Sequence, residues 1–109
     1  MSYTHVVNEQ PMLSSAARTT SGQSSGFRIN SFLEGNILIN VTAASGTLTI
    51  IPSISFDNST YFRKDITYEI SAIGQYCIPI TNFGKYLRAD YTITDGGSFT
   101  FSLGFMGKE

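Results

Sequence analysis

The feature that most constrains this chain is a strict alternation of large apolar and small polar side chains near its C-terminal end. Phe99, Phe101, Leu103 and Phe105 alternate there with Ser98, Thr100, Ser102 and Gly104. Successive side chains of a β-strand point to opposite faces of its sheet, so this spacing predicts a strand with one buried face. The same alternation recurs at 86–93, at 48–54 and at 76–80. We therefore expect half-buried antiparallel strands and no helix of consequence.

Turn signals separate these runs at intervals of roughly ten residues. They include Ser45-Gly46, Asp57-Asn58-Ser59 and Asp95-Gly96-Gly97. Short strands at this spacing predict an all-β fold, an antiparallel β-sandwich or jelly roll of seven to eight strands, over residues 27–109.

Two further features indicate where particular strands lie in the sheets. The middle of segment 36–43 is apolar on both faces, which is typical of a central or covered strand. Pro52 and Pro79 fall inside strand-like runs, so each is expected at an edge strand, a bulge or a strand end.

The first 26 residues have a different composition. Positions 14–26 are rich in Ser, Thr and Gly and contain almost no large apolar side chain, which predicts an extended polar N-terminal arm outside the sandwich. Two apolar pairs within the arm could dock on a neighbour, Val6 with Val7 and Met12 with Leu13, and Arg18 joins them as a candidate interface residue. The alternative is a mobile terminus with no role.

Charge and hydropathy exclude two classes of partner. Charged residues make up 14% of the chain and the formal net charge is −1, whereas a nucleic-acid-binding protein shows a basic excess. The longest aliphatic run in the uncharged stretch 35–56 is Ile37-Leu38-Ile39, far below the length of a membrane span. A signal peptide is not visible at the N-terminus. We expect a soluble protein that binds neither nucleic acid nor membrane.

Residues that could carry chemistry are few. His5 is the only histidine and lies in the arm, and Cys77 is the only cysteine and lies on a predicted strand. Neither has the partners of a catalytic triad or a zinc site, so we expect no enzyme activity, no metal and no cofactor. The run 57–60 could offer oxygens to calcium, but it lacks the glycine and distal glutamate of a calcium loop and is interpreted as a turn.

The remaining candidates are aromatic and basic side chains of the second half. Tyr61, Phe62 and Tyr68 could form a sugar-stacking platform, but core packing or a subunit contact is the favoured interpretation. The basic residues at 63–64, 85 and 88 could form a basic patch, although Asp65 and Asp90 nearby favour ion pairs.

The order of turns and strands resembles that of small tailed-phage structural proteins. Those proteins carry a Thr-Ala-x-Ser-Gly hairpin, an acidic turn before a Trp or Tyr, a Gly-x-Tyr strand, a Phe-Gly-x-Tyr-x-Arg corner, and Tyr-Thr and Ser-Phe-Thr-Phe strands. The corresponding segments here are 41–49, 57–61, 74–76, 83–88, 91–94 and 97–102, with Tyr61 where the family often has tryptophan. The resemblance covers residues 36–103.

This resemblance implies a β-sandwich of the phage virion, most specifically a capsid decoration protein of the auxiliary or cement type. The expected partners are the major capsid protein and further copies of the chain, as a homotrimer on the capsid surface after assembly in the host cytoplasm. Such proteins have no catalytic residues. The alternatives are a tail, head-fibre, receptor-binding or carbohydrate-binding module and, more remotely, a small secreted inhibitor or enzyme.

Overall fold

A computed structural model describes residues 7–24, 26–28, 34–64, 66–81, 85–94 and 96–108. These ranges contain ten β-strands and no helix, so none of the described residues belongs to a helix that could cross a membrane. The strands are β1 (Val7–Arg18), β2 (Gly22–Gln23), β3 (Phe27–Arg28), β4 (Glu34–Ser45), β5 (Leu48–Ser55), β6 (Phe62–Arg63), β7 (Tyr68–Ile70), β8 (Gly74–Thr81), β9 (Tyr86–Ile93) and β10 (Ser98–Lys108). The prediction of an all-β chain is confirmed.

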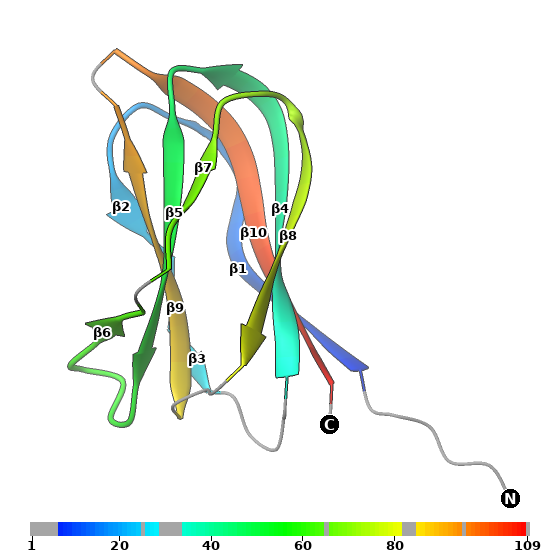
Figure 1. Ribbon diagram of the computed structural model, residues 1–109, viewed down its shortest axis with the longest axis vertical. Coiled ribbons are helices and arrows are strands. Elements are labelled where there is room, and N and C mark those ends of the chain that lie inside the picture. The colour runs from blue at the N-terminus through cyan, green and yellow to red at the C-terminus, as the bar shows by residue number, and fades with distance from the viewer. Residues whose placement is uncertain are drawn as a thin grey trace, which may run out of the picture.

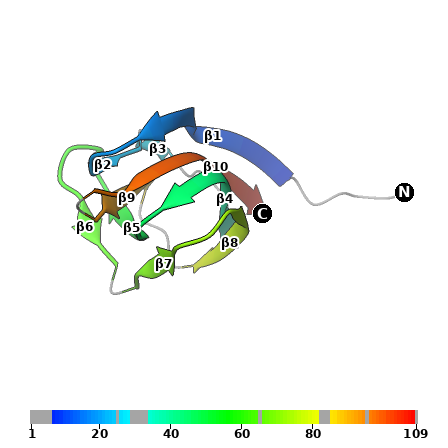
Figure 2. The same ribbon diagram turned by 90° about the horizontal axis from the view of Figure 1, so that it is seen from above.

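The strands form two antiparallel sheets that face each other (Figures 1 and 2). Sheet A has the strand order β1-β10-β4-β8. Sheet B has the order β2-β9-β5-β6, and β3 and β7 add to it through β9 and β5. The result is a two-layered, sandwich-like fold.

Alternate residues of the central strands fill the space between the sheets. Phe99, Phe101 and Phe105 of β10 are fully buried, and Leu103 is nearly so. Leu87 and Ala89 of β9 approach from sheet B. The strand phase predicted for β10 and β9 is therefore confirmed, and the aromatic edge-to-face contact between Phe101 and Tyr91 joins the two sheets at a centroid distance of 5.2 Å.

The alternation predicted for β5 is observed, and the outer side of the strand is buried near its end as well. Ile54 is half-buried and packs against the core, while Ser53 and Ser55 on the other side are buried. These two serines donate hydrogen bonds to Asp90 and Asp57, so polar groups of sheet B and of the following turn cover the outer side of the strand there.

The strand positions expected from segment 36–43 and from Pro79 are observed, whereas Pro52 lies inside β5, which is not an edge strand. Strand β4 lies between β10 and β8, in the middle of sheet A, and Pro79 lies on the edge strand β8. Pro52 lies on β5 between the stretches that pair with β7 and β6, where the Lys64 amide donates to the Pro52 carbonyl at 2.8 Å. Neither proline needs to donate a ladder hydrogen bond at these places.

The prediction of a separate polar arm is wrong for the described part of that segment. Strand β1 pairs with β10 from Val7 opposite Lys108 to Arg18 opposite Phe99, with two register shifts, and Met12 lies in the core at 4% exposure. Strands β2 and β3 then cross to sheet B and pair with β9 (Figure 2). Val6 and His5 lie outside the described residues.

Hydrogen bonds explain how so polar a segment joins the sandwich. The hydroxyl oxygens of Ser21 and Ser24 accept hydrogen bonds from the backbone amides of Ile93 and Ala89, at 3.1 and 2.9 Å. Gly22 lies so close to the Tyr91 ring that a Cβ would fall 2.6 Å from its hydroxyl oxygen. Serine and glycine therefore suit an edge that covers the side of β9 rather than a free arm.

Candidate interaction surfaces

The structure separates the candidate interface residues into four groups. Met12 is a core residue, and Tyr68 packs against the core from β7. Val7 starts β1, and Leu13 is half-buried on the same strand. Arg18 lies at the end of β1, Tyr61 lies just before β6, and Phe62 is the first residue of β6. Of these, Phe62 is exposed and Tyr61 is half-buried, while Leu13 packs against the core and also lines a surface groove.

Arg18 has a structural position at the side of the sandwich. Its guanidinium carbon lies 5.7 Å from the Phe101 ring centroid and 6.0 Å from that of Tyr91. One terminal nitrogen donates to the Ser14 carbonyl at 2.9 Å. The side chain covers two core rings and is held by cation–π attraction, so we assign it to fold stability.

The segment from Ser55 to Thr60 is a turn built around one carboxylate. Asp57 Oδ1 accepts hydrogen bonds from the Ser59 and Thr60 amides and from the Ser55 hydroxyl, each at 2.9 Å. Those backbone amides, first Thr60 and then Ser59, together with the Ser55 hydroxyl lower the pKa of Asp57 below its usual value. Asn58 takes the left-handed backbone conformation, with φ of 60°, that asparagine tolerates better than most residues. The turn interpretation of segment 57–60 is the one that these contacts support.

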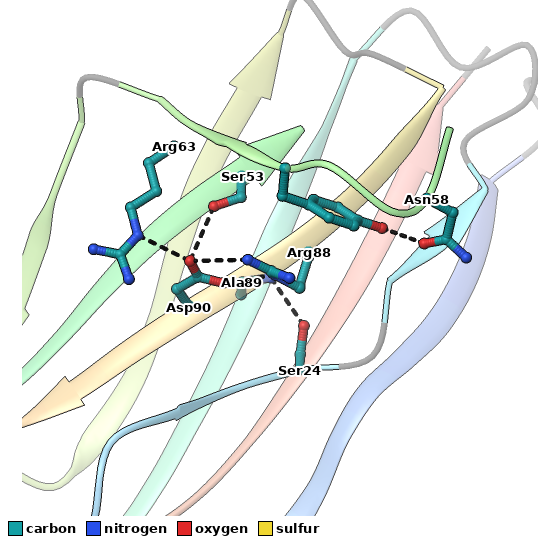
Figure 3. Close-up of polar contacts among 8 residues, drawn as sticks. Ser24, Ser53, Asn58, Arg63, Arg88, Ala89 and Asp90 are labelled. Carbon is teal, nitrogen blue, oxygen red and sulfur yellow. Dashed lines mark hydrogen bonds and ion pairs between the residues drawn. The ribbon is translucent and has the colours of Figure 1, made fainter. Parts of the chain in front are cut away.

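The buried carboxylate of Asp90 on β9 binds side chains from three strands of sheet B (Figure 3). Asp90 accepts hydrogen bonds from Ser53 Oγ at 3.2 Å, Arg63 Nε at 3.0 Å and Arg88 Nε at 2.8 Å. Its side chain is 5% exposed, against 19% for Arg88 and 61% for Arg63. The three donors come from three strands, so Asp90 joins β5, β6 and β9 on the outer side of sheet B.

Tyr61 lies over this ion-paired group. Its ring centroid is 4.2 Å from the Arg88 guanidinium carbon, and its hydroxyl donates to Asn58 Oδ1. Burial raises the pKa of Tyr61. A Cβ at Gly26 would overlap the Tyr61 hydroxyl, so the N-terminal edge of sheet B contacts the same ring. The ion pairs expected among 63–90 therefore exist for Arg63, Arg88 and Asp90, but at a more buried place than a surface pair.

Two phenylalanines at the ends of this turn are left exposed. Phe56, directly after β5, is 68% exposed, and Phe62, the first residue of β6, is 55% exposed. We call residues 55–63 the aromatic loop. The Asp57 turn and the Asp90 group fix its backbone on both sides, so the loop offers two apolar rings at a preorganised position.

A different surface covers the outer side of sheet A. A shallow groove of about 640 Å³ crosses all four strands of this sheet. It is lined by Pro11, Leu13, Ser14, Leu38, Ile39, Asn40, Gln75, Tyr76, Cys77, Ser102, Leu103 and Gly104. None of these residues is charged, so the groove suits an apolar or neutral polar partner.

The sequence indicated some of these features and missed others. Tyr61 and Phe62 were identified as candidates by their aromatic character, and Leu13 by its apolar neighbour. The hydrogen bond between Ser53 and Asp90, which links β5 to β9, was not predicted. The alternation of β9 does place Arg88 and Asp90 on the same side of the strand. Among the described residues, no group of three His, Cys, Asp or Glu could hold a metal ion.

Comparison with protein-family models, with curated proteins and with solved structures finds no match to this chain.

Proposed function

We propose that this chain is a structural protein without enzymatic activity, a capsid decoration protein of a tailed phage. It binds the major capsid protein on the outer surface of the head, as a homo-oligomer, and stabilises the shell. The support from the sequence is the series of turn and strand motifs between residues 36 and 103. The support from the structure is the order of the strands and the fixed backbone of the aromatic loop.

The strand order supports a jelly roll. Counting β2 and β3 as one interrupted strand and leaving out the two-residue β6 gives eight strands. The first then pairs with the eighth, the second with the seventh, the third with the sixth and the fourth with the fifth. This is the pairing of a long hairpin rolled into two sheets, an architecture common in viral capsid and lectin domains.

The observation that carries the attachment is the aromatic loop. Aromatic side chains are the anchors of many protein interfaces. Phe56 and Phe62 are exposed while their backbone is fixed by the Asp57 turn and the Asp90 group. The loop therefore binds without a large ordering cost. The loop, and not the N-terminal arm, is the proposed attachment element, because β1 in the described part of that arm belongs to sheet A.

Phage heads that lack the protein provide the test. Heads and purified protein are mixed and sedimented together, and bound protein is measured over a range of concentrations. We expect saturable binding, and an affinity at least about tenfold lower for Phe62→Ala. Ile73→Ala is the matched control, because Ile73 is 66% exposed in the turn between β7 and β8 and lies outside the aromatic loop.

Two results would contradict this proposal. Absence of binding to heads by the unaltered chain removes the decoration role. Equal affinities of the Phe62→Ala and Ile73→Ala variants would place the attachment elsewhere on the protein. Thermal melting of both variants should match that of the parent, because each removed side chain is exposed.

A receptor- or carbohydrate-binding role is the second candidate, and one observation favours it. The Tyr61 ring lies over Arg88, and Arg63, whose side chain is 61% exposed, binds the same Asp90 carboxylate, so an aromatic ring and guanidinium donors occur together. Sugars bind proteins through ring stacking combined with hydrogen bonds. Binding on a glycan array that Tyr61→Ala abolishes, together with no binding to heads, would favour this role.

A further inference from the structure

The middle of the outer face of sheet A is built from uncharged residues in register. One row across the sheet consists of Pro11, Gly104, Leu38 and Cys77 on β1, β10, β4 and β8. The next row contains Ser102, Asn40 and Gln75 on the last three of these strands. Sheet faces that remain in water usually carry charged side chains, so two uncharged rows in the centre of a sheet indicate contact with another protein surface.

The shape of this face is complementary to the same face of a second copy. Leu38 is half-buried and pairs in register with Gly104, which has no side chain. The groove therefore has a projecting leucine directly beside a hollow. A neighbouring copy offers the same projection and the same hollow, so each leucine can occupy the space above the partner's glycine. Asn40, Gln75 and Ser102 provide both donors and acceptors, which also match a copy of themselves.

The area of this face reaches the size of a weak but specific contact. Four strands about 4.8 Å apart, over about eight residues of 3.3 Å each, cover about 500 Å² in projection. Two such faces bury about 1,000 Å² in total, which is the lower limit for specific association. A charged partner surface would lose solvation here without gaining an ion pair, which disfavours partners with charged surfaces.

We propose that the outer face of sheet A, centred on Leu38, Asn40 and Gly104, is the surface through which one copy of this chain binds another. Because the same patch faces itself, this contact joins two copies about a twofold axis and differs from the threefold arrangement of a trimer. The inference rests on the homo-oligomer part of the proposed function and not on attachment to a capsid. It also separates the two surfaces: sheet A joins copies, and the aromatic loop over sheet B stays free for a different partner (Figure 2).

The test is a matched pair of lysine substitutions. Asn40 on β4 and Thr92 on β9 are both exposed, uncharged strand residues, on sheet A and sheet B respectively. Asn40→Lys places a charge in the centre of the proposed interface, and Thr92→Lys places one on the other sheet. Molar mass is measured by light scattering coupled to size-exclusion chromatography, and folding by circular dichroism melting.

We expect an oligomeric mass for the parent and for Thr92→Lys, and the mass of a single chain for Asn40→Lys with its melting transition retained. A parent that is monomeric at 100-fold dilution and at high concentration alike would overturn the inference. So would an Asn40→Lys variant with the parent's oligomeric mass, or equal dissociation of both variants. If Asn40→Lys does not fold, Gln75→Lys at the edge of the same row replaces it.

Cys77 supplies a second readout in the unaltered protein. It is an exposed free thiol that lines the groove, so association should slow its reaction with a maleimide. We expect the labelling rate to rise at least about tenfold on dilution below the dissociation constant, and to be fast at all concentrations for Asn40→Lys. A rate that is independent of concentration in an oligomeric parent would contradict the placement of the interface.

Failure of this inference and failure of the proposed function give different results. A monomeric protein that still binds heads through Phe62 overturns the self-association on sheet A and leaves the decoration role. An oligomer that Asn40→Lys dissociates, but that does not bind heads, supports the self-association and removes the decoration role.

Discussion

At the scale of single residues, Asp90 is the described side chain that links the most strands through hydrogen bonds and ion pairs. Its carboxylate accepts hydrogen bonds from a serine and two arginines on three different strands. A carboxylate so little exposed requires these donors, because an unpaired buried charge is costly. The donors require Asp90 in turn, since Arg88 is only 19% exposed and Ser53 is fully buried.

We therefore predict that Asp90→Ala destabilises the protein by about 3–5 kcal/mol, as expected when one member of a buried charged group is removed. Arg63→Ala is the control and should cost less than about 1 kcal/mol, because most of the Arg63 side chain is in solvent. Urea denaturation followed by circular dichroism measures both. Equal losses for the two variants would show that Asp90 is not the centre of the group.

The residues of this group could be predicted only in part from the sequence. Opposite charges at positions 88 and 90 indicate an ion pair on the outward side of a strand, and that ion pair exists. The burial of Asp90 depends on Ser53 and Arg63, which are 37 and 27 positions away in the chain. Sequence periodicity describes one strand at a time. It cannot show which residues of other strands cover a side chain such as Asp90.

At the scale of elements, β1 differs most from expectation. A strand in the middle of a sheet reveals itself by its apolar face, as β10, β9 and β4 do. An edge strand needs few apolar side chains, because backbone hydrogen bonds to one neighbour hold it in place. Strand β1 contributes Met12 to the core and otherwise pairs its backbone with β10, so its composition gave little indication of its position.

Deletion of residues 1–26 is consequently expected to abolish cooperative folding. It would remove β1 and β2, expose the side of β10, and take away the serine hydroxyls that bond to the amides of β9. A domain of this size has little stability to lose. Thermal melting by circular dichroism is the measurement. A truncated chain that melts as the parent does would show that residues 7–26 are a dispensable arm after all.

A single-residue control separates loss of the strand from loss of its polar side chains. Met12→Ala should cost about 2–5 kcal/mol through the cavity it leaves in the core. Ser15→Ala, at an exposed position of the same strand, should change the free energy of unfolding by less than about 0.5 kcal/mol.

At the scale of the whole molecule, the two sheets have outer faces of different chemistry. Ion pairs and exposed rings cover one end of sheet B, while the centre of sheet A is neutral. Two distinct faces suit a protein that contacts its own copies on one side and another partner on the other. Length, alternation and turn spacing predicted the two layers, but not which outer face would be neutral, because that depends on which strands become neighbours.

Salt should distinguish the proposed contact between copies from one made by charges. Association through neutral rows should keep the same oligomeric mass from about 0.05 to about 0.5 M NaCl, since screening acts only on charged groups. Light scattering across this range measures it. Dissociation as salt increases would show instead that ion pairs at the rim of sheet A hold the copies together.

The prolines and register shifts at the margins of the sheets have a consequence for aggregation. An open strand edge can recruit further strands without limit and so seed fibrils. Here Pro11 and two register shifts lie in β1, Pro79 lies in the edge strand β8, and Pro52 separates the pairings of β7 and β6 along β5. Growth by strand addition is therefore hindered at these margins, which favours closed assemblies of defined size. With such margins a β-protein can reach high concentration without forming amyloid.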